Sequence, residues 1–115
     1  MKRIQTTGVF PSIAASALTE FKQIAADLLD GALNESGTLE YDWFFNADET
    51  QCVVRETFAD SDAALAHMAN AGARLGRLVE LGGGVRIELF GNPSPELRAA
   101  LAAFDPPVYA FAQGK

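Results

Sequence analysis

The chain has 115 residues, of which 49% are hydrophobic and 21% charged, and its formal net charge at pH 7 is −6. This size and composition predict a single globular domain over residues 1–115 and exclude a largely disordered chain. The acidic balance argues against binding to nucleic acid or to an anionic membrane, because both attract basic patches.

The sequence shows no apolar run long enough to cross a membrane, and its beginning lacks the apolar stretch of a signal peptide. Its single cysteine, Cys52, cannot form an internal disulfide. We therefore expect a reducing, cytoplasmic setting, with Cys52 packed as a small apolar residue in a strand.

The first two elements are a strand and a long helix. Residues 3–10 contain β-branched residues and end at Pro11, as a strand does. From about Ala14 to Asn34, spacings of three and four predict an amphipathic helix, with Ser12 or Ser16 as its cap and Gly37 beyond its end. The apolar face of this helix consists of Leu18, Phe21, Ile24, Ala25, Leu28 and Leu29.

A hairpin follows, with alternating residues from Leu39 to Phe45 and a second strand over 52–58. A turn centred on Asp48 and Glu49 gives facing residues whose numbers sum to 97. One face then carries the pairs Phe45 with Cys52, Trp43 with Val54, Tyr41 with Glu56 and Leu39 with Phe58. The other face sets Asp42 opposite Arg55, and this pairing of opposite charges favours the register.

The second half of the chain begins with a helix capped by Asp60 or Ser61 that runs to about Asn70. Gly72 and Gly76 break or bend this helix, and the apolar residues Leu75, Leu78, Val79 and Leu81 continue an apolar stripe. Glycines 82–84 form a turn into a strand over 85–90. Ser94 and Pro95 begin a short helix to about Phe104, and residues 108–111 can form a last strand.

This order of elements predicts the ferredoxin-like α+β fold, an antiparallel sheet with helices on one face. The opposite face would carry Phe44, Val53 and Phe90 among charged residues, which is too apolar to leave open. A homodimer that stacks two sheets into a barrel covers it most simply.

Three segments of the central region carry a family resemblance. Residues 37–44 (GTLEYDWF), 53–61 (VVRETFADS) and 63–68 (AALAHM) resemble the hairpin and second helix of the antibiotic biosynthesis monooxygenase family. The resemblance implies a dimeric α+β barrel. It also implies one of several activities, because some members oxidise polycyclic phenols or dihydroquinones with molecular oxygen and no added cofactor, others degrade haem, and many have no established activity.

The haem-degrading branch differs from this sequence at its three marker positions. That branch places an Asn on the first strand, a Trp at the end of the third and a His late in the second helix. Here the corresponding positions hold Thr6 and Thr7, Phe58, and residues 75–79 without a His. The resemblance therefore does not extend to haem turnover.

The helix-facing side of the hairpin is the candidate site. Tyr41, Trp43, Val54, Phe58 and Met68 would supply apolar walls for an aromatic molecule, and Glu56 and His67 the polar groups. Neutral His67, or His67 oriented by Glu56, would act as the base that removes a phenolic proton. The predicted function is cofactor-independent oxidation of a small aromatic phenol or quinol by molecular oxygen.

Other interpretations remain open at this point. Glu56 and His67 can be a buried structural pair, and the two aromatic residues Tyr41 and Trp43 ordinary core. The whole chain can equally be a non-catalytic dimeric module that binds a small apolar ligand or a partner protein. Arg86 and Glu88 are expected to form a charge pair in the barrel or in solvent.

Several other chemistries lack the residues that they need. One His and one Cys cannot build a zinc site, so we expect no structural metal. Glycines 82–84 precede a strand, whereas a phosphate-binding loop opens a helix.

Overall fold

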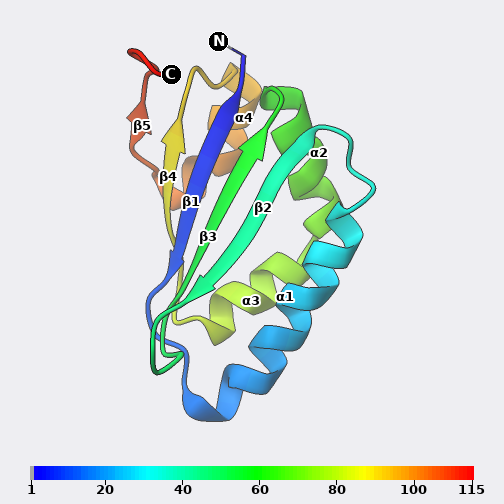
Figure 1. Cartoon of the computed structure of the whole chain (residues 1–115), viewed down its shortest axis with the longest axis vertical. Coiled ribbons are helices and arrows are strands. Elements are labelled where there is room, and N and C mark those ends of the chain that lie inside the picture. The colour runs from blue at the N-terminus through cyan, green and yellow to red at the C-terminus, as the bar shows by residue number, and fades with distance from the viewer. Residues whose placement is uncertain (1) are drawn as a thin grey trace.

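The computed structural model describes residues 2–115; Met1, the first residue of the predicted domain, lies outside the described residues. The strands are β1 (Ile4–Phe10), β2 (Thr38–Phe45), β3 (Cys52–Phe58), β4 (Arg86–Phe90) and β5 (Val108–Tyr109). The helices are α1 (Leu18–Ala32), α2 (Ser61–Ala71), α3 (Ala73–Leu81) and α4 (Pro95–Leu101), with 3₁₀ turns at Ala15–Ala17 and Ala102–Phe104. Figure 1 shows this arrangement.

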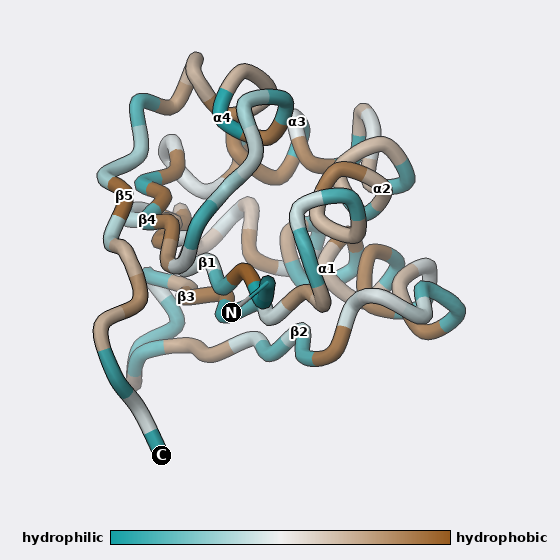
Figure 2. Tube along the Cα trace, turned by 90° about the horizontal axis from the view of Figure 1, so that it is seen from above, coloured by the Kyte–Doolittle hydropathy of each residue, from teal (hydrophilic) through white to brown (hydrophobic). Residues whose placement is uncertain are grey.

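The five strands form one open sheet in the order β2-β3-β1-β4-β5. All neighbouring pairs are antiparallel except β4 and β5, which are parallel. The helices lie on one side of this sheet, as the view from above shows (Figure 2). The predicted ferredoxin-like α+β fold is therefore confirmed, with β5 as an added edge strand.

The hairpin register is confirmed from Tyr41 to Phe45, where Trp43 faces Val54 and Phe45 faces Cys52. The predicted pairing of Leu39 with Phe58 is wrong. Thr38 faces Phe58, a bulge intervenes before Glu40, and Leu39 is 49% exposed. A bulge adds one residue to its strand, so every residue before it shifts relative to the partner.

The charge argument for this register is not supported by the side chains. Asp42 does face Arg55, but no ion pair joins them in the described part of the chain. The turn supplies the constraint instead, because Asn46 and Gln51 are joined by a backbone and a side-chain hydrogen bond.

Two of the helix caps are as predicted and one is not. The Asp60 carboxylate accepts a hydrogen bond from the backbone N–H of Ala63 at the start of α2, and Ser94 caps α4 in the same way. At α1 neither Ser12 nor Ser16 caps the helix, because a 3₁₀ turn precedes it and Ala17 occupies the cap position. Gly72, with φ of +54°, separates α2 from α3.

The core lies between the sheet and the helices. Phe21 of α1, Leu78 of α3 and Leu89 of β4 are completely buried. Leu29, which was predicted on the apolar face of α1, is 39% exposed and marks the edge of that face. The loop before β2 packs tightly on α2, because a Cβ on Gly37 would lie 2.5 Å from the Ala63 Cβ.

The other face of the sheet is only partly covered within one chain. Phe44 is 51% exposed and Tyr109 49%, and the C-terminal tail extends on this side of the sheet (Figure 2). Among the helices of residues 2–115, none combines the length and the apolar character that crossing a bilayer requires.

Candidate functional site

A cavity of about 90 Å³ lies between the sheet and helices α2, α3 and α4. Its lining is mainly apolar, and its ionisable members include Glu56 and His67. The apolar residues predicted for the site all line it: Tyr41, Trp43, Val54, Phe58 and Met68. The hairpin and α2 therefore bring the seven predicted site residues to one cavity.

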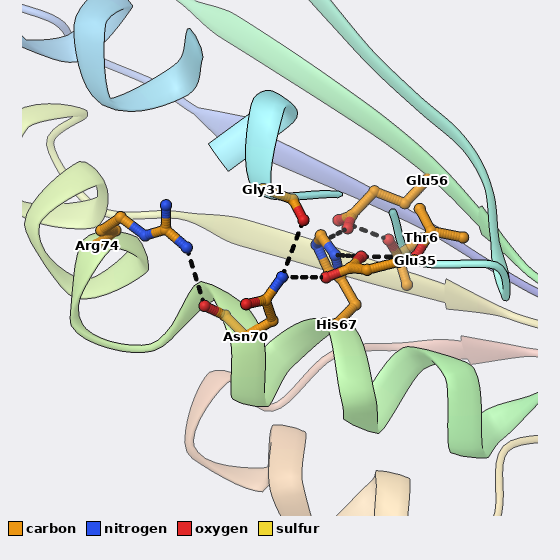
Figure 3. A network of polar contacts seen from close by, with 8 residues as sticks. Thr6, Gly31, Glu35, Glu56, His67, Asn70 and Arg74 are labelled. Atoms are coloured by element: carbon orange, nitrogen blue, oxygen red, sulfur yellow. Dashed lines mark hydrogen bonds and ion pairs between the residues drawn. The ribbon is translucent and has the colours of Figure 1, made fainter. Parts of the chain in front are cut away.

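His67 lies between two carboxylates. Its Nδ1 is 2.7 Å from Oε1 of Glu35, and its Nε2 is 2.9 Å from Oε2 of Glu56. The side chains are 8%, 16% and 19% exposed for His67, Glu35 and Glu56. We call these three residues the histidine cluster (Figure 3).

Local structure explains how these three side chains meet. Glu56 is on β3 and points to the helix side, like the buried neighbours Val54 and Phe58 two residues away. His67 comes from the buried side of α2. Glu35 comes from the loop after α1, and the close approach of Gly37 to α2 holds this loop beside His67.

The charges of the cluster favour a protonated His67. Burial disfavours the imidazolium, but the hydrogen bonds and negative charges of Glu56 and Glu35 outweigh it and raise the pKa of His67. Both ring nitrogens face carboxylate oxygens, so a cation that donates from both fits this geometry. The raised pKa argues against a neutral His67 as the base, which is one of the two forms expected from the sequence, while the second form, His67 oriented by Glu56, stays a prediction.

Glu35 is the best-connected carboxylate of the cluster. Burial alone raises its pKa, but hydrogen bonds from Asn70, His67 and Thr38 outweigh that effect and lower it. Asn70 Nδ2 donates to Glu35 Oε2 at 2.6 Å, and Thr38 Oγ1 donates to Oε1 at 2.8 Å. Glu35 is thus held as an anion.

Further contacts tie the cluster to the surrounding elements (Figure 3). Thr6 of β1 donates to Oε1 of Glu56 at 3.1 Å. Asn70 also donates to the carbonyl of Gly31, and Arg74 donates to the carbonyl of Asn70. The network thereby links β1, β3, α1, α2 and α3.

Aromatic rings surround the imidazole on the cavity side. The Tyr41 ring centroid is 4.7 Å from that of His67, and the Phe58 centroid is 5.3 Å away. Trp43 lies beyond Tyr41, with 5.2 Å between their centroids. Burial and the charges of Glu56 and Glu35 raise the pKa of Tyr41, so its phenol stays protonated and does not serve as a base.

Sequence reasoning missed Glu35, Asn70 and Thr38 and singled out Thr6 only as a replacement for the Asn of the haem-degrading branch. Glu35 lies in the turn before β2, outside the segments that resemble the family, and Thr38 lies inside the first of those segments without an expected role. Only the packing of that turn onto α2 brings them to His67.

The remaining titratable candidates lie outside the cluster. Cys52 is fully buried, and burial raises the pKa of its thiol to about 11. Arg86 and Glu88 do not form the predicted pair in the described chain; Glu88 accepts a hydrogen bond from Thr7 at 2.9 Å. Across residues 2–115, no group of three or more His, Cys, Asp or Glu side chains is placed to hold a metal ion.

The open five-stranded sheet with its one-sided helices and internal cavity defines an α+β module of the ferredoxin-like class. A family model described as antibiotic biosynthesis monooxygenase matches residues 9–76. The chain belongs to this family, as the resemblance of its central segments implied. No curated protein matches the chain significantly.

Solved structures share the fold over most of their length. MupZ from Pseudomonas fluorescens is 26% identical with a TM-score of 0.82, over 100% of this chain and 94% of that one. A candidate antibiotic biosynthesis monooxygenase from Caulobacter crescentus is 27% identical with a TM-score of 0.63, over 76% and 87%. SnoaB, a cofactor-independent oxygenase from Streptomyces nogalater represented by its N63A mutant, is 16% identical with a TM-score of 0.62, over 82% and 96%.

Proposed function

We propose that the protein is a cofactor-independent monooxygenase that oxidises a small aromatic phenol or quinol with molecular oxygen. The observation that carries the proposal is the Glu56 carboxylate paired with the His67 imidazole on the wall of a mainly apolar cavity. Family membership and the shared fold of SnoaB, a cofactor-independent oxygenase, support this class of reaction.

In the proposed reaction the substrate supplies the electrons and the protein supplies a base and an apolar enclosure. Glu56 accepts the phenolic proton, since it lines the cavity and carries a negative charge when ionised. The adjacent His67 cation stabilises the anion that remains on the substrate. One oxygen atom then replaces hydrogen on a ring carbon and becomes an oxygen of a quinone product, and the other leaves as water with the two hydrogens that the substrate loses, so the substrate supplies all four electrons.

The cavity volume restricts the size of the substrate. At about 90 Å³ it is smaller than a cavity of about 150 Å³ that accommodates benzene. Even a single aromatic ring therefore requires the cavity to widen, so we propose one-ring phenols and quinols as the first substrates to test.

Oxygen uptake with one-ring phenols and quinols tests the proposal, and three-ring anthrones test the expected limit on substrate size. Glu56→Gln should lower the rate by about 10²- to 10⁴-fold, the usual contribution of a positioned base. Asp30→Asn is the matched control, because it neutralises an exposed carboxylate of α1 and should leave the rate unchanged. Absence of oxygen consumption with every substrate, or equal rates in wild type and Glu56→Gln, would contradict the proposal.

A second candidate function is a non-catalytic module that binds a small apolar ligand. The small cavity and the internal pairing of Glu35, His67 and Glu56 favour it, because these charges already satisfy one another. Native mass spectrometry that finds a tightly bound molecule, released unchanged under aerobic conditions, would support this function over oxidation.

We also propose a homodimer formed through the open face of the sheet, in a cytoplasmic, reducing setting. The half-exposed rings of Phe44 on β2 and Tyr109 on β5 support it, because a second sheet stacked on this face would cover both edge strands. Light scattering should give twice the chain mass at micromolar concentration, and Phe44→Lys should shift that mass toward one chain. A stable monomer of the wild-type chain would contradict the dimer.

A further inference from the structure

The two carboxylates of the histidine cluster differ in what they can reach. Glu56 lines the cavity, whereas Glu35 faces the other ring nitrogen of His67 and is not part of the cavity wall. Both oxygens of Glu35 already accept hydrogen bonds from the protein, Oε1 from His67 and Thr38 and Oε2 from Asn70. A proton released by a substrate in the cavity therefore reaches Glu56 and not Glu35.

The proposed reaction changes the charge of Glu56 and leaves that of Glu35 as it is. When Glu56 accepts the phenolic proton, its side chain becomes neutral, and Nε2 of His67 no longer faces an anion. The side chain of His67 is only 8% exposed, so burial disfavours its cation at that moment. An imidazolium without a neighbouring anion would return a proton to the substrate anion and reverse the step.

We infer that Glu35 is a positioning residue that holds the ring of His67 and keeps it positively charged while Glu56 carries the substrate proton. The 2.7 Å contact between Nδ1 of His67 and Oε1 of Glu35 supplies both effects, because it fixes the direction of the ring and places an anion beside it. Tyr41, which packs on His67 from β2, cannot replace this anion, because its raised pKa keeps the phenol neutral. The inference rests on the proposed function in assigning the substrate proton to Glu56.

Titration of His67 in variants of the two carboxylates tests this directly. Glu56→Gln reproduces the neutral side chain that Glu56 presents after it accepts a proton. His67 is the only His of the chain, so long-range ¹H–¹⁵N spectra give one set of imidazole signals to follow against pH. In Glu56→Gln the midpoint should stay above the ordinary imidazole value of about 6.5, because Glu35 remains. In Glu35→Gln/Glu56→Gln it should fall below that value, because burial then acts without a neighbouring anion.

Three further variants complete the titration. Glu35→Asp/Glu56→Gln restores a carboxylate at position 35 and should raise the midpoint above that of the double Gln variant. The single variant Glu35→Gln, which can still accept a hydrogen bond from Nδ1, should lower the midpoint relative to wild type, and it serves as the test if circular dichroism shows the double variant unfolded. Asp30→Asn is the matched control, because it neutralises an exposed carboxylate of α1 and should leave the midpoint unchanged.

Oxygen uptake supplies a second readout. Glu35→Gln should lower kcat more at pH 8 than at pH 6, because its His67 loses the proton at a lower pH, and should change KM little, because Glu35 does not line the cavity. A midpoint below about 6.5 in Glu56→Gln, an unchanged midpoint in Glu35→Gln, or equal losses of kcat at both pH values would overturn the inference. The titrations need no substrate. The expected midpoints without any oxygen uptake would therefore refute the proposed oxidation and leave the hold of Glu35 on His67 standing.

Discussion

Removing the cation of the histidine cluster should destabilise the fold strongly. In His67→Ala, Glu35 and Glu56 lose the imidazolium that lies 2.7 and 2.9 Å from their oxygens, while both carboxylates remain mostly buried. Leaving a buried charge without its partner costs about 3–5 kcal/mol. Typical domains have a free energy of unfolding of only about 5–15 kcal/mol, so the expected loss is a large fraction of the total.

The pH dependence of this loss follows from the two pKa shifts. The pKa of His67 is raised on folding. Its contribution to the free energy of unfolding is therefore fully present below the pKa of the unfolded state, about 6.5, and is lost as pH rises through the pKa of the folded state. The pKa of Glu35 is lowered, so its contribution is present above about 4.3 and is lost as pH falls through the folded value. The cluster should therefore stabilise most between about pH 4.3 and 6.5.

Urea unfolding followed by far-UV circular dichroism, from pH 4.5 to pH 9, measures the free energy of unfolding of wild type and of His67→Ala. The difference in free energy of unfolding between wild type and His67→Ala should be largest near pH 6. It should become smaller at alkaline pH, by at most about 1.4 kcal/mol per pH unit for one proton. Phe21→Leu changes buried packing without changing charge, so its loss of free energy of unfolding relative to wild type should not vary with pH. A difference for His67→Ala that is the same at pH 6 and pH 9 would refute the protonated cluster.

Three further predictions concern the scaffold. Gly37→Ala should destabilise by about 1–3 kcal/mol in urea unfolding, because its Cβ would meet the Ala63 Cβ at 2.5 Å. Gly76→Ala is its control and should stabilise by up to about 1 kcal/mol, since it lies in a helix with open space around it; equal effects would contradict the tight contact. Asp60→Ala should cost about 0.5–2 kcal/mol through the lost cap of α2, and thermal melts that do not change would argue against that cap. The thiol of Cys52, buried and with its pKa raised to about 11, should react with an aromatic disulfide reagent at pH 8 only in urea, and rapid native labelling would contradict its burial.

The sequence allowed most of the fold to be predicted, because its strongest signals are local. Period-two alternation predicted β2, and a turn centred on Asp48 and Glu49 predicted its register with β3 from Tyr41 to Phe45. Capping by Asp60 and Ser94 predicted the starts of two helices. The pairing of Leu39 failed because a bulge is a local irregularity that alternation does not reveal.

The candidate site was predictable only in part. Residues on regular elements, such as Glu56 and His67, could be assigned to one side of the sheet from periodicity. Glu35 could not, because it sits in a loop whose path depends on how Gly37 packs against α2. Its presence changes the chemistry of the cluster, because a second carboxylate favours the charged form of His67 over the neutral one.

By itself the sequence determined the elements, their order and the side of the sheet on which the aromatic residues lie, since these follow from hydrogen bonding and burial over a few neighbouring residues. Only the tertiary structure decided the two carboxylate contacts that raise the pKa of His67, the small volume of the cavity and, within residues 2–115, the buried indole N–H of Trp43 without an acceptor. Those properties depend on atoms that are far apart in the chain and on interatomic distances that matter to a few tenths of an ångström. No local sequence pattern encodes such distances.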